Sequence, residues 1–207
     1  MAKLYFRYGA MNSGKSTGLL QAAFNYEERG QRVLIAKPAK DTKSDGDIVS
    51  RLGMGRSVDF LIPPDAPVRA LYAAKAAGDD QDALLKHVEI PPVACLLVDE
   101  AQFLEPEQVD DLFRIAVLDN VPVLAYGIRT DFRTRMFPGS LRLMELAHSL
   151  EELKTICRCG RKAIFNARRI GDQVVFDGEQ VAIDGQDVMY ESLCGSCYLE
   201  ASAGRLG

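Results

Sequence analysis

Short runs of apolar residues alternate along the chain with segments whose apolar positions recur at helical spacing. The first run, Leu4 to Tyr8, ends at a turn rich in Gly, Ser and Asn. Apolar residues then recur every three or four positions from Lys15 to Arg29, which predicts a helix. The next run, Arg32 to Lys37, is apolar at successive positions, as expected for a parallel strand buried on both faces. These segments predict a strand-helix-strand unit.

The same alternation continues through the middle of the chain. Val68 to Val88 has a helical pattern that is broken near Gly78. Val93 to Val98 and Val121 to Tyr126 predict two more buried strands, and Pro106 to Leu118 predicts a helix with proline in its first turn. Strands that alternate with helices in this way predict an α/β fold with a doubly wound parallel sheet.

Other segments lack these patterns. Pro38 to Gly55 is rich in Asp, Lys, Ser and Gly, so we expect a mobile loop over a site rather than a packed element. Thr130 to Ser140 combines arginines with phenylalanines, and we interpret it as an active-site loop. From about Glu151 no helical pattern is visible, and strand-like pieces are expected at Ala163–Phe165, Gln173–Phe176 and Gln180–Ile183. The chain therefore divides into a main α/β domain over residues 1–150 and a small lobe over residues 151–207.

The composition narrows the classes of function. With 207 residues and a formal net charge of −4, the chain has room for one good core and an appendage, and binding of nucleic acid over the whole surface is disfavoured. No apolar run approaches the roughly 20 residues that span a bilayer, and the start of the chain lacks a signal-peptide core. We therefore expect a cytoplasmic protein that binds a small anionic ligand, with no nucleic-acid or membrane partner.

The turn after the first predicted strand matches the phosphate-binding motif G-x-x-x-x-G-K-[ST], in the strand-to-helix context that this motif requires. Glycines let backbone N–H groups face the phosphates, and the helix N-terminus adds a favourable dipole. Lys15 is expected to bridge the β and γ phosphates of ATP, and Ser16 to ligate Mg²⁺. The residues of this loop are Gly9, Ala10, Met11, Asn12, Ser13, Gly14, Lys15 and Ser16.

Two carboxylates follow the strand Val93 to Val98, at the end where open α/β sheets bind ligands. Asp99 is expected in the Mg²⁺ shell, and Glu100 is placed to take a proton from an attacking oxygen or to orient it. The alternative is that both residues only cap the turn after the strand. Cys95, in the middle of the same strand, is interpreted as a core residue.

Four of the five cysteines form two close pairs near the C-terminus, Cys157-x-Cys159 and Cys194-x-x-Cys197. Disulfides are not expected in a reducing compartment, so metal binding is the leading explanation. Four thiolates would make a closed, structural Zn²⁺ site that joins the two ends of a small lobe. The one-residue spacer in the first pair leaves open a tighter chelate geometry or loss of the metal, and structural cysteines without a metal are the alternative.

Several segments together resemble the type II, or cellular-type, thymidine kinase family. They are residues 9–17, Val98-Asp99-Glu100-Ala101-Gln102-Phe103, Tyr126 to Arg133 and the four-cysteine lobe. The resemblance runs from about Leu4 to Tyr198. It implies a P-loop (RecA-like) doubly wound parallel sheet with a small C-terminal β zinc-binding lobe. It also implies transfer of the γ-phosphate of ATP to the 5′-hydroxyl of thymidine, with deoxyuridine as a further acceptor, to give dTMP in pyrimidine salvage.

The resemblance assigns roles to individual residues. Glu100 becomes the general base for the 5′-hydroxyl. Binding of ATP and Mg²⁺ is implied for the loop residues, for Thr17 and for Asp99, Glu100, Ala101 and Gln102. A lasso from Asn166 to Tyr190 is expected to close over the base, and the implied thymidine contacts are Met11, Phe103, Phe132, Phe137, Arg168, Val181, Ile183 and Tyr190. A homotetramer and feedback inhibition by thymidine triphosphate are implied as well.

The chain departs from the family pattern at two positions. Lys43 replaces the usual arginine after Asp41-Thr42, and Asn166 replaces the threonine common in animal members. The short spacer of Cys157-x-Cys159 is like that of some bacterial members, so zinc is retained as the expected metal.

Two other classes of function share some of these features. A nucleic-acid-stimulated ATPase can combine a P-loop, an Asp-Glu strand end and a zinc ribbon, but the short length and acidic balance argue against it. A regulatory nucleotide-binding module would keep Gly14, Lys15 and Ser16 but would not need Glu100 beside an aromatic wall. Release of ADP with and without thymidine separates the three classes.

Overall fold

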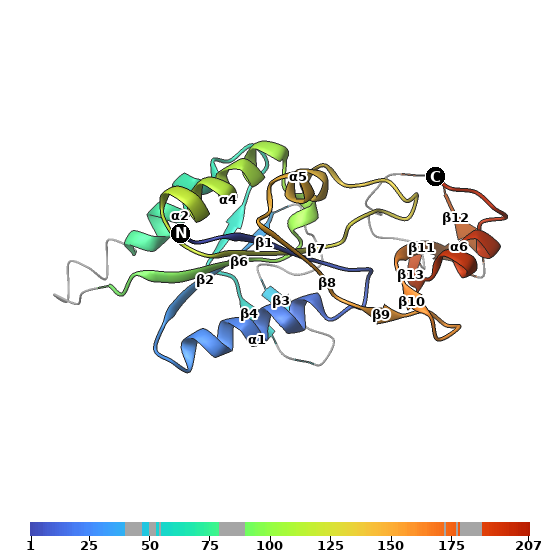
Figure 1. Ribbon diagram of the computed structural model, residues 1–207, viewed down its shortest axis with the longest axis horizontal. Coiled ribbons are helices and arrows are strands. Elements are labelled where there is room, and N and C mark those ends of the chain that lie inside the picture. Colours follow the sequence, from blue (N-terminus) through green and yellow to red (C-terminus); the bar gives the residue numbers. More distant parts are fainter. Residues whose placement is uncertain are drawn as a thin grey trace.

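A six-stranded sheet with helices on both faces forms the larger part of the molecule, and a smaller C-terminal lobe lies beside it (Figure 1). The computed structural model describes residues 1–39, 47–49, 53, 55–78, 90–171, 173–176, 178 and 188–207. The six strands are parallel, in the order β5-β2-β6-β7-β1-β8. Their bounds are Leu4–Tyr8 (β1), Arg32–Pro38 (β2), Phe60–Ile62 (β5), Val93–Val98 (β6), Val123–Gly127 (β7) and Ser149–Glu152 (β8). The predicted parallel α/β sheet is confirmed.

Helices cover both faces of this sheet. One face carries α1, and the other carries α2, α4 and α5 (Figure 1). Their bounds are Lys15–Glu27 (α1), Val68–Ala77 (α2), Pro106–Leu118 (α4) and Pro138–Leu146 (α5). Helix α4 starts as predicted at Pro106, where Glu105 and Gln108 form a capping box. Within the described part of the chain, no helix combines the length and apolar character needed to cross a bilayer.

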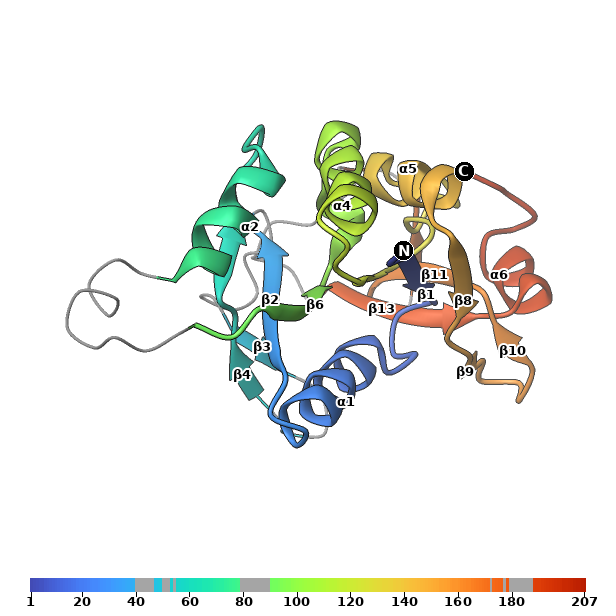
Figure 2. The same cartoon turned by 60° about the vertical axis from the view of Figure 1, so that its left-hand side comes forward.

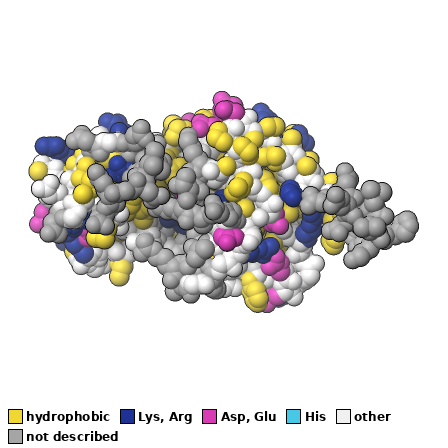
Figure 3. Space-filling view, turned by 180° about the vertical axis from the view of Figure 1, so that it is seen from behind, with side chains coloured by type: hydrophobic (Ala, Val, Ile, Leu, Met, Phe, Trp, Pro, Cys, Tyr) yellow, Lys and Arg dark blue, Asp and Glu magenta, His cyan; other side chains and the backbone are white. Residues whose placement is uncertain are grey.

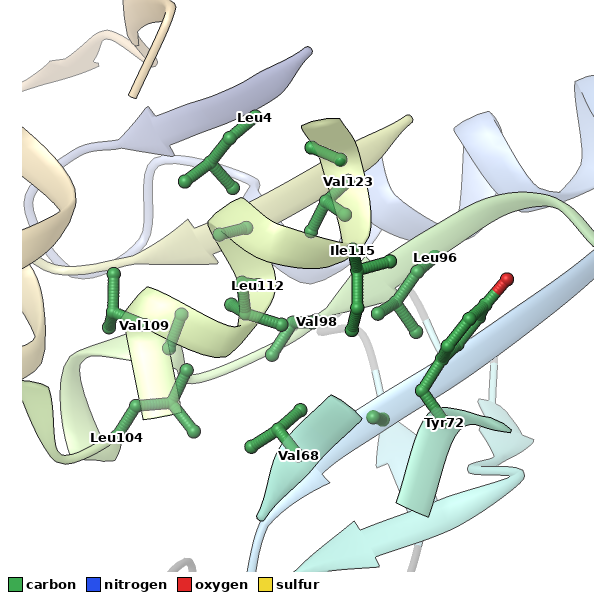
Figure 4. Packing of buried hydrophobic residues seen from close by; sticks show 14 of the residues in the cluster. Leu4, Val68, Tyr72, Leu96, Val98, Leu104, Val109, Leu112, Ile115 and Val123 are labelled. Carbon is green, nitrogen blue, oxygen red and sulfur yellow. The ribbon is translucent and has the colours of Figure 1, made fainter. Parts of the chain in front are cut away.

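Successive residues of the central strands point to opposite faces of the sheet, which explains why these strands are apolar at every position. In β2, Leu34 and Ala36 belong to the core beneath α2, α4 and α5, whereas Val33 and Ile35 belong to the core beneath α1. Figure 4 shows the first of these cores, where side chains of α4 lie beside those of β1, β6 and β7. Burial on both faces therefore places these strands in the middle of the sheet.

Several short elements of the main domain differ from what the sequence predicts. Helix α5 starts inside the segment interpreted as an active-site loop, and β8 follows it directly. Strand β3 (Asp47–Val49) pairs with β4 (Gly55–Ser57) where a loop was expected, and Ile48 is buried in the core beneath α1. The expectation of a loop is therefore wrong for these residues. Helix α5 has nine residues, β8 has four and β3 has three, and elements this short do not show a clear periodic pattern in the sequence.

Some predicted boundaries shift by one to a few residues. Helix α1 ends at Glu27 rather than Arg29, and β7 covers Val123–Gly127 rather than Val121–Tyr126. Helix α2 ends at Ala77, and the remainder of the helix predicted to reach Val88 falls largely on residues 79–89, outside the described residues. Lys43 also lies outside them.

The described residues of the lobe form two small antiparallel sheets and a helix. Figure 2 shows the chain passing from β8 into the first of these sheets. The strands are β9 (Thr155–Ile156) with β10 (Lys162–Ala163), and β11 (Phe165–Ile170) between β12 (Gln173–Val175) and β13 (Val188–Leu193). The seven-residue helix α6 (Gly195–Ala201) corrects the expectation that no helix follows Glu151. The strand expected at Gln180–Ile183 lies outside the described residues.

Candidate active site

The phosphate-binding loop joins the C-terminal end of β1 to the N-terminus of α1. Its first glycine, Gly9, has no room for a side chain, because a Cβ there would overlap the Ser13 side chain and the carbonyl oxygen of Leu153. Gly14 has φ = 76°, in the left-handed region that glycine adopts without strain. These two glycines let the loop close tightly in front of the helix end, which is the part of a helix that binds anions.

Lys15 is buried at the first position of α1, with 9% of its surface exposed. Its Nζ donates to the carbonyl oxygen of Ala10 at 2.9 Å and lies 3.4 Å from Oγ of Ser13. Burial lowers the pKa of the Lys15 ammonium, and the carboxylates of Glu100 and Asp99 oppose this effect. A cation is therefore held inside the loop and close to two acidic groups.

Ser16 and Asp99 connect the start of α1 to the end of β6. The Ser16 hydroxyl donates to Oδ2 of Asp99 at 3.0 Å. Asp99 is 4% exposed, and burial, followed by the neighbouring carboxylate of Glu100, raises its pKa. A hydroxyl and a carboxylate are the oxygen donors that Mg²⁺ prefers. The pair therefore fits the metal expected from the sequence.

Glu100 opens the 3₁₀ turn η1 (Ala101–Phe103) that follows β6. Its φ is 48°, a left-handed conformation that is uncommon for a residue with a side chain. Its Oε2 accepts a hydrogen bond from Nε2 of Gln102 at 2.5 Å. The next two residues are buried, Ala101 completely and Gln102 with 1% of its surface exposed. The carboxylate of Glu100, in contrast, interacts electrostatically with the Lys15 ammonium.

Phe132, Arg168 and Tyr190 come together between the main domain and the lobe. The guanidinium carbon of Arg168 lies 3.7 Å from the ring centroid of Phe132. Nε of Arg168 donates to the Tyr190 hydroxyl at 3.1 Å, across the pairing of β11 with β13. Three of the expected thymidine contacts therefore form one group, in which the cation covers a face of the aromatic ring.

A second aromatic pair lies on the main domain. Phe103 at the end of η1 and Phe137 just before α5 meet edge to face, with ring centroids 5.6 Å apart. The remaining expected contacts, Val181 and Ile183, lie outside the described residues.

Met11, in the middle of the phosphate-binding loop, is held by two residues of the lobe. Its N–H donates to Oδ1 of Asn166 at 2.7 Å, and its carbonyl oxygen accepts from Oγ of Ser192 at 2.5 Å. Asn166 on β11 and Ser192 on β13 are direct cross-strand partners, and we refer to this pair as the Met11 clasp. Nδ2 of Asn166 also donates to the carbonyl oxygen of Thr130 at 3.1 Å. The clasp thus joins the lobe to two loops of the main domain.

Most of the residues that dock the lobe on the main domain were not predicted from the sequence. Ser192 is one of them. In addition, the hydroxyl of Tyr198 donates to the carbonyl oxygen of Phe132 at 2.7 Å, and Oγ1 of Thr155 donates to the carbonyl oxygen of Asn12 at 3.2 Å. Their partners are backbone carbonyls, which every residue type carries, so no motif marks these contacts.

The four clustered cysteines are Cys157, Cys159, Cys194 and Cys197, whose Sγ atoms lie within 4.8 Å of one another. The one-residue spacer is accommodated by a tight turn, in which the N–H of Gly160 donates to the carbonyl oxygen of Cys157 at 2.8 Å. The sulfur of Cys194 caps α6 by accepting from the N–H of Cys197 at 3.5 Å. Zinc–sulfur bonds of about 2.3 Å in a tetrahedron separate the sulfurs by about 3.8 Å, so the cluster has the size and donor set of a Zn²⁺ site.

Comparison with known proteins relates both parts of the molecule to one family. A family model described as thymidine kinase matches residues 2–198. The chain belongs to the thymidine kinase family. The thymidine kinase of Idiomarina loihiensis is 47% identical over 97% of this chain and 98% of its own length, and that of Ruegeria pomeroyi is 44% identical over 98% and 96%. The thymidine kinase of Enterobacteria phage T4 is 45% identical over 94% of each chain.

Membership of the thymidine kinase family confirms the resemblance seen in the sequence. The match includes the P-loop, the Asp99-Glu100 segment and the cysteine lobe in one continuous range. An ATPase that moves along nucleic acid and a regulatory nucleotide-binding module are therefore not supported. Thymidine kinase relatives cover nearly the whole chain, so the lobe is part of the shared architecture rather than an addition.

Proposed function

We propose that the protein transfers the γ-phosphate of ATP to the 5′-hydroxyl of thymidine, with deoxyuridine as a second acceptor. The observation that carries this proposal is the meeting of Lys15, Asp99 and Glu100 beside the phosphate-binding loop. A cation for the phosphates, a carboxylate for Mg²⁺ and a second carboxylate for the acceptor proton are what phosphoryl transfer to a hydroxyl requires. Similarity to thymidine kinases over nearly the full length directs the choice of acceptor.

The donor half of the site binds ATP through the phosphate-binding loop. Backbone N–H groups of the loop and the N-terminus of α1 hold the phosphate oxygens. Lys15 stabilises the negative charge that develops on the transferred phosphoryl group. Ser16 and Asp99 would hold Mg²⁺, which neutralises charge on the phosphates when it is bound.

Glu100 is the general base of the proposed reaction. Its carboxylate takes the proton of the 5′-hydroxyl while that oxygen forms a bond to the γ-phosphorus. The bond between the γ-phosphorus and the bridging oxygen breaks, and its electron pair leaves with ADP. Because Oε2 of Glu100 already accepts from Gln102, the other carboxylate oxygen is the one assigned to the substrate proton.

The acceptor half of the site is an apolar wall on the main domain faced by the lobe. The base of thymidine is proposed to lie against Phe103, Phe132 and Phe137, near Met11. The guanidinium of Arg168 packs over the Phe132 ring and helps to fix its orientation, which gives the wall a defined shape. The lobe residues assigned to thymidine are Arg168 and Tyr190, together with Val181 and Ile183.

The cysteine cluster is proposed to hold one structural Zn²⁺. The core of the lobe consists of seven buried residues in the described part of the chain, three of which are cysteines. A core of this size supplies little apolar burial, so a metal that joins β9-β10 to α6 would contribute much of the folding energy.

The charge distribution agrees with a small-molecule kinase. On the face shown in Figure 3, lysine and arginine side chains of the described residues are scattered among acidic ones instead of forming a continuous basic area. Sequence-independent binding of nucleic acid depends on such an area. A homotetramer and inhibition by thymidine triphosphate stay predictions, which light scattering and a kinase assay with added triphosphate would test.

The decisive experiment is the release of ADP from ATP by the purified protein with and without nucleosides. We expect release to depend on thymidine, with weaker stimulation by deoxyuridine and none by purine nucleosides, and we expect dTMP in amounts equal to ADP. ADP release without an acceptor that increases on addition of nucleic acid would indicate the ATPase class. ATP binding without turnover under all conditions would indicate a regulatory module.

A further inference from the structure

Among the described residues, Gln102 is the one whose side chain donates a hydrogen bond to the Glu100 carboxylate. Nε2 of Gln102 lies 2.5 Å from Oε2 of Glu100. The backbone of Glu100 is left-handed, with φ = 48°, so its side chain leaves the chain in an unusual direction. Gln102 holds one of the two carboxylate oxygens of this side chain.

The orientation of the Gln102 amide follows from its second contact. Oε1 of Gln102 accepts a hydrogen bond from the backbone N–H of Ile128 at 3.1 Å. A backbone N–H can only donate, so the amide oxygen must face Ile128 and the NH₂ group must face Glu100. Gln102 is 1% exposed, so solvent offers no competing partner. The amide is therefore a fixed donor aimed at the carboxylate.

The turn that carries Gln102 is itself clamped by the neighbouring backbone. A Cβ on Gly127 would lie 2.8 Å from Oε1 of Gln102, and a Cβ on Gly139 would lie 2.7 Å from the carbonyl oxygen of Ala101. At position 139 only glycine fits against these backbone oxygens, and at position 127 any larger residue would displace the Gln102 amide. The carbonyl oxygen of Ile128 in turn accepts from Oγ of Ser140, in α5, at 2.6 Å. A continuous series of contacts thus runs from α5 through Ile128 and Gln102 to Glu100.

We propose that Gln102 is a positioning residue for the general base, and not a ligand of ATP. The inference rests on the proposed role of Glu100. By donating to Oε2, the amide holds the carboxylate in one rotamer and leaves the other oxygen for the 5′-hydroxyl. A base displaced by about 1 Å can lose on the order of 100-fold in rate, so this support acts on turnover and not on substrate binding.

The first test is Gln102→Met, which keeps the length of the side chain and removes both amide contacts. We expect kcat to fall about 10- to 100-fold, while KM for ATP and for thymidine stays within about threefold. Gln108→Met is the matched control. Gln108 is also buried, at 4% exposure, and its amide also bonds backbone groups, donating to the carbonyl oxygen of Pro63 at 2.8 Å, but it lies in α4 outside the site. This control should lower the melting temperature and leave kcat unchanged.

Two further measurements separate positioning from a general structural effect. In a Glu100→Gln background, Gln102→Met should have almost no additional effect on kcat, because residues that act as a unit are not additive. Gln102→Glu keeps an acceptor for the Ile128 N–H but sets a carboxylate against Glu100. We expect it to lower kcat at least as far as Gln102→Met does, with KM for both substrates within about threefold of the native value, because the donor to Oε2 of Glu100 is lost while the contact to Ile128 is kept. Lys15 and Asp99, the charged groups beside Glu100, are the same in all variants.

Three results would overturn the inference. The first is a native kcat in Gln102→Met. The second is a loss of kcat from Gln102→Met that is as large in the Glu100→Gln background as in the native protein. The third is an effect confined to KM for ATP, which would make Gln102 a nucleotide ligand. Failure of the proposed function would look different, because the unaltered protein would then release no ADP in response to thymidine.

Discussion

The main domain buries many more apolar residues than the C-terminal lobe does. The sheet of the main domain lies between two cores, and the larger one contains strand residues such as Leu34 and Val98 together with α4 residues such as Leu112. Among its described residues, the lobe has one small core, in which cysteine sulfurs take the place of aliphatic side chains. We expect the first part to fold on apolar burial and the second to depend on the proposed metal. The proposed reaction divides in the same way, with phosphate chemistry on the main domain and much of the acceptor site on the lobe.

The largest effect is expected from a change confined to the main domain. Lys15→Ala should abolish phosphoryl transfer, because the cation that faces the developing charge is lost while the sheet is unaffected. Steady-state assays at saturating ATP and thymidine measure this loss. Lys162→Ala, which removes an exposed lysine of the lobe paired with Glu152, serves as the control and should be active. Turnover near the native rate in Lys15→Ala would contradict the assignment of the phosphate-binding loop.

Glu100→Gln should lower kcat by about two to four orders of magnitude, the usual contribution of a positioned base. Binding of ATP and thymidine, measured by titration calorimetry, should stay close to native because the substitution changes little besides the charge. Weakened binding with unchanged turnover at saturation would instead make Glu100 a residue that grips a ligand.

Removal of zinc tests the lobe directly. The purified protein is expected to carry one Zn²⁺ per chain, and stripping it with a chelator, or Cys194→Ser, should disorder the lobe while the main sheet stays folded. Thymidine binding should weaken more than ATP binding. Cys95→Ala is the matched control, since Cys95 is buried in β6, where burial raises the pKa of its thiol to about 12, and zinc content should not change. A zinc-free native protein would refute the prediction, as would native thymidine affinity in Cys194→Ser.

The Met11 clasp links the two parts directly, because it joins the lobe to the middle of the phosphate-binding loop. Ser192→Ala removes one hydrogen bond to the carbonyl oxygen of Met11, and a bond of this kind contributes about 1 kcal/mol. We therefore expect KM for ATP to rise about fivefold. Ser196→Ala, on the outer part of the lobe where the hydroxyl accepts from Arg161, should leave KM unchanged. An unaltered KM in Ser192→Ala would mean that the loop keeps its shape without this hydrogen bond.

The sequence was most informative where a motif and a regular element coincide. Gly9 to Ser16 lies between an apolar run and a helical pattern, so both the fold and the placement of Lys15 followed from local information. Helix α5 and strand β8 were missed because they are short, and β8, at the edge of the sheet, exposes Leu150 and Glu151. Edge strands lack the two-sided burial that makes central strands recognisable.

The hydrogen bonds that hold Gln102 and Met11 in place could not be predicted from sequence patterns, for another reason. Gln102 is fixed by the N–H of Ile128, and Met11 is fixed by residues far along the chain. Contacts to backbone groups depend on how distant segments are brought together, and this is decided by the packing of the whole fold. The four cysteines were found because sulfur chemistry restricts them to few roles, and the structure brings the two pairs together.

The left-handed backbone at Glu100 lowers the stability of the folded protein. Its φ of 48° is unfavourable for a residue with a side chain, by about 1 kcal/mol, and its carboxylate lies next to that of the buried Asp99. Asparagine tolerates left-handed backbone and carries no charge. Glu100→Asn should therefore melt about 2 to 4 °C above the native protein in calorimetry while transferring no phosphate, and a lower melting temperature would show that the Gln102 contact outweighs the strain. Selection for heat resistance and selection for turnover are opposed at this one residue.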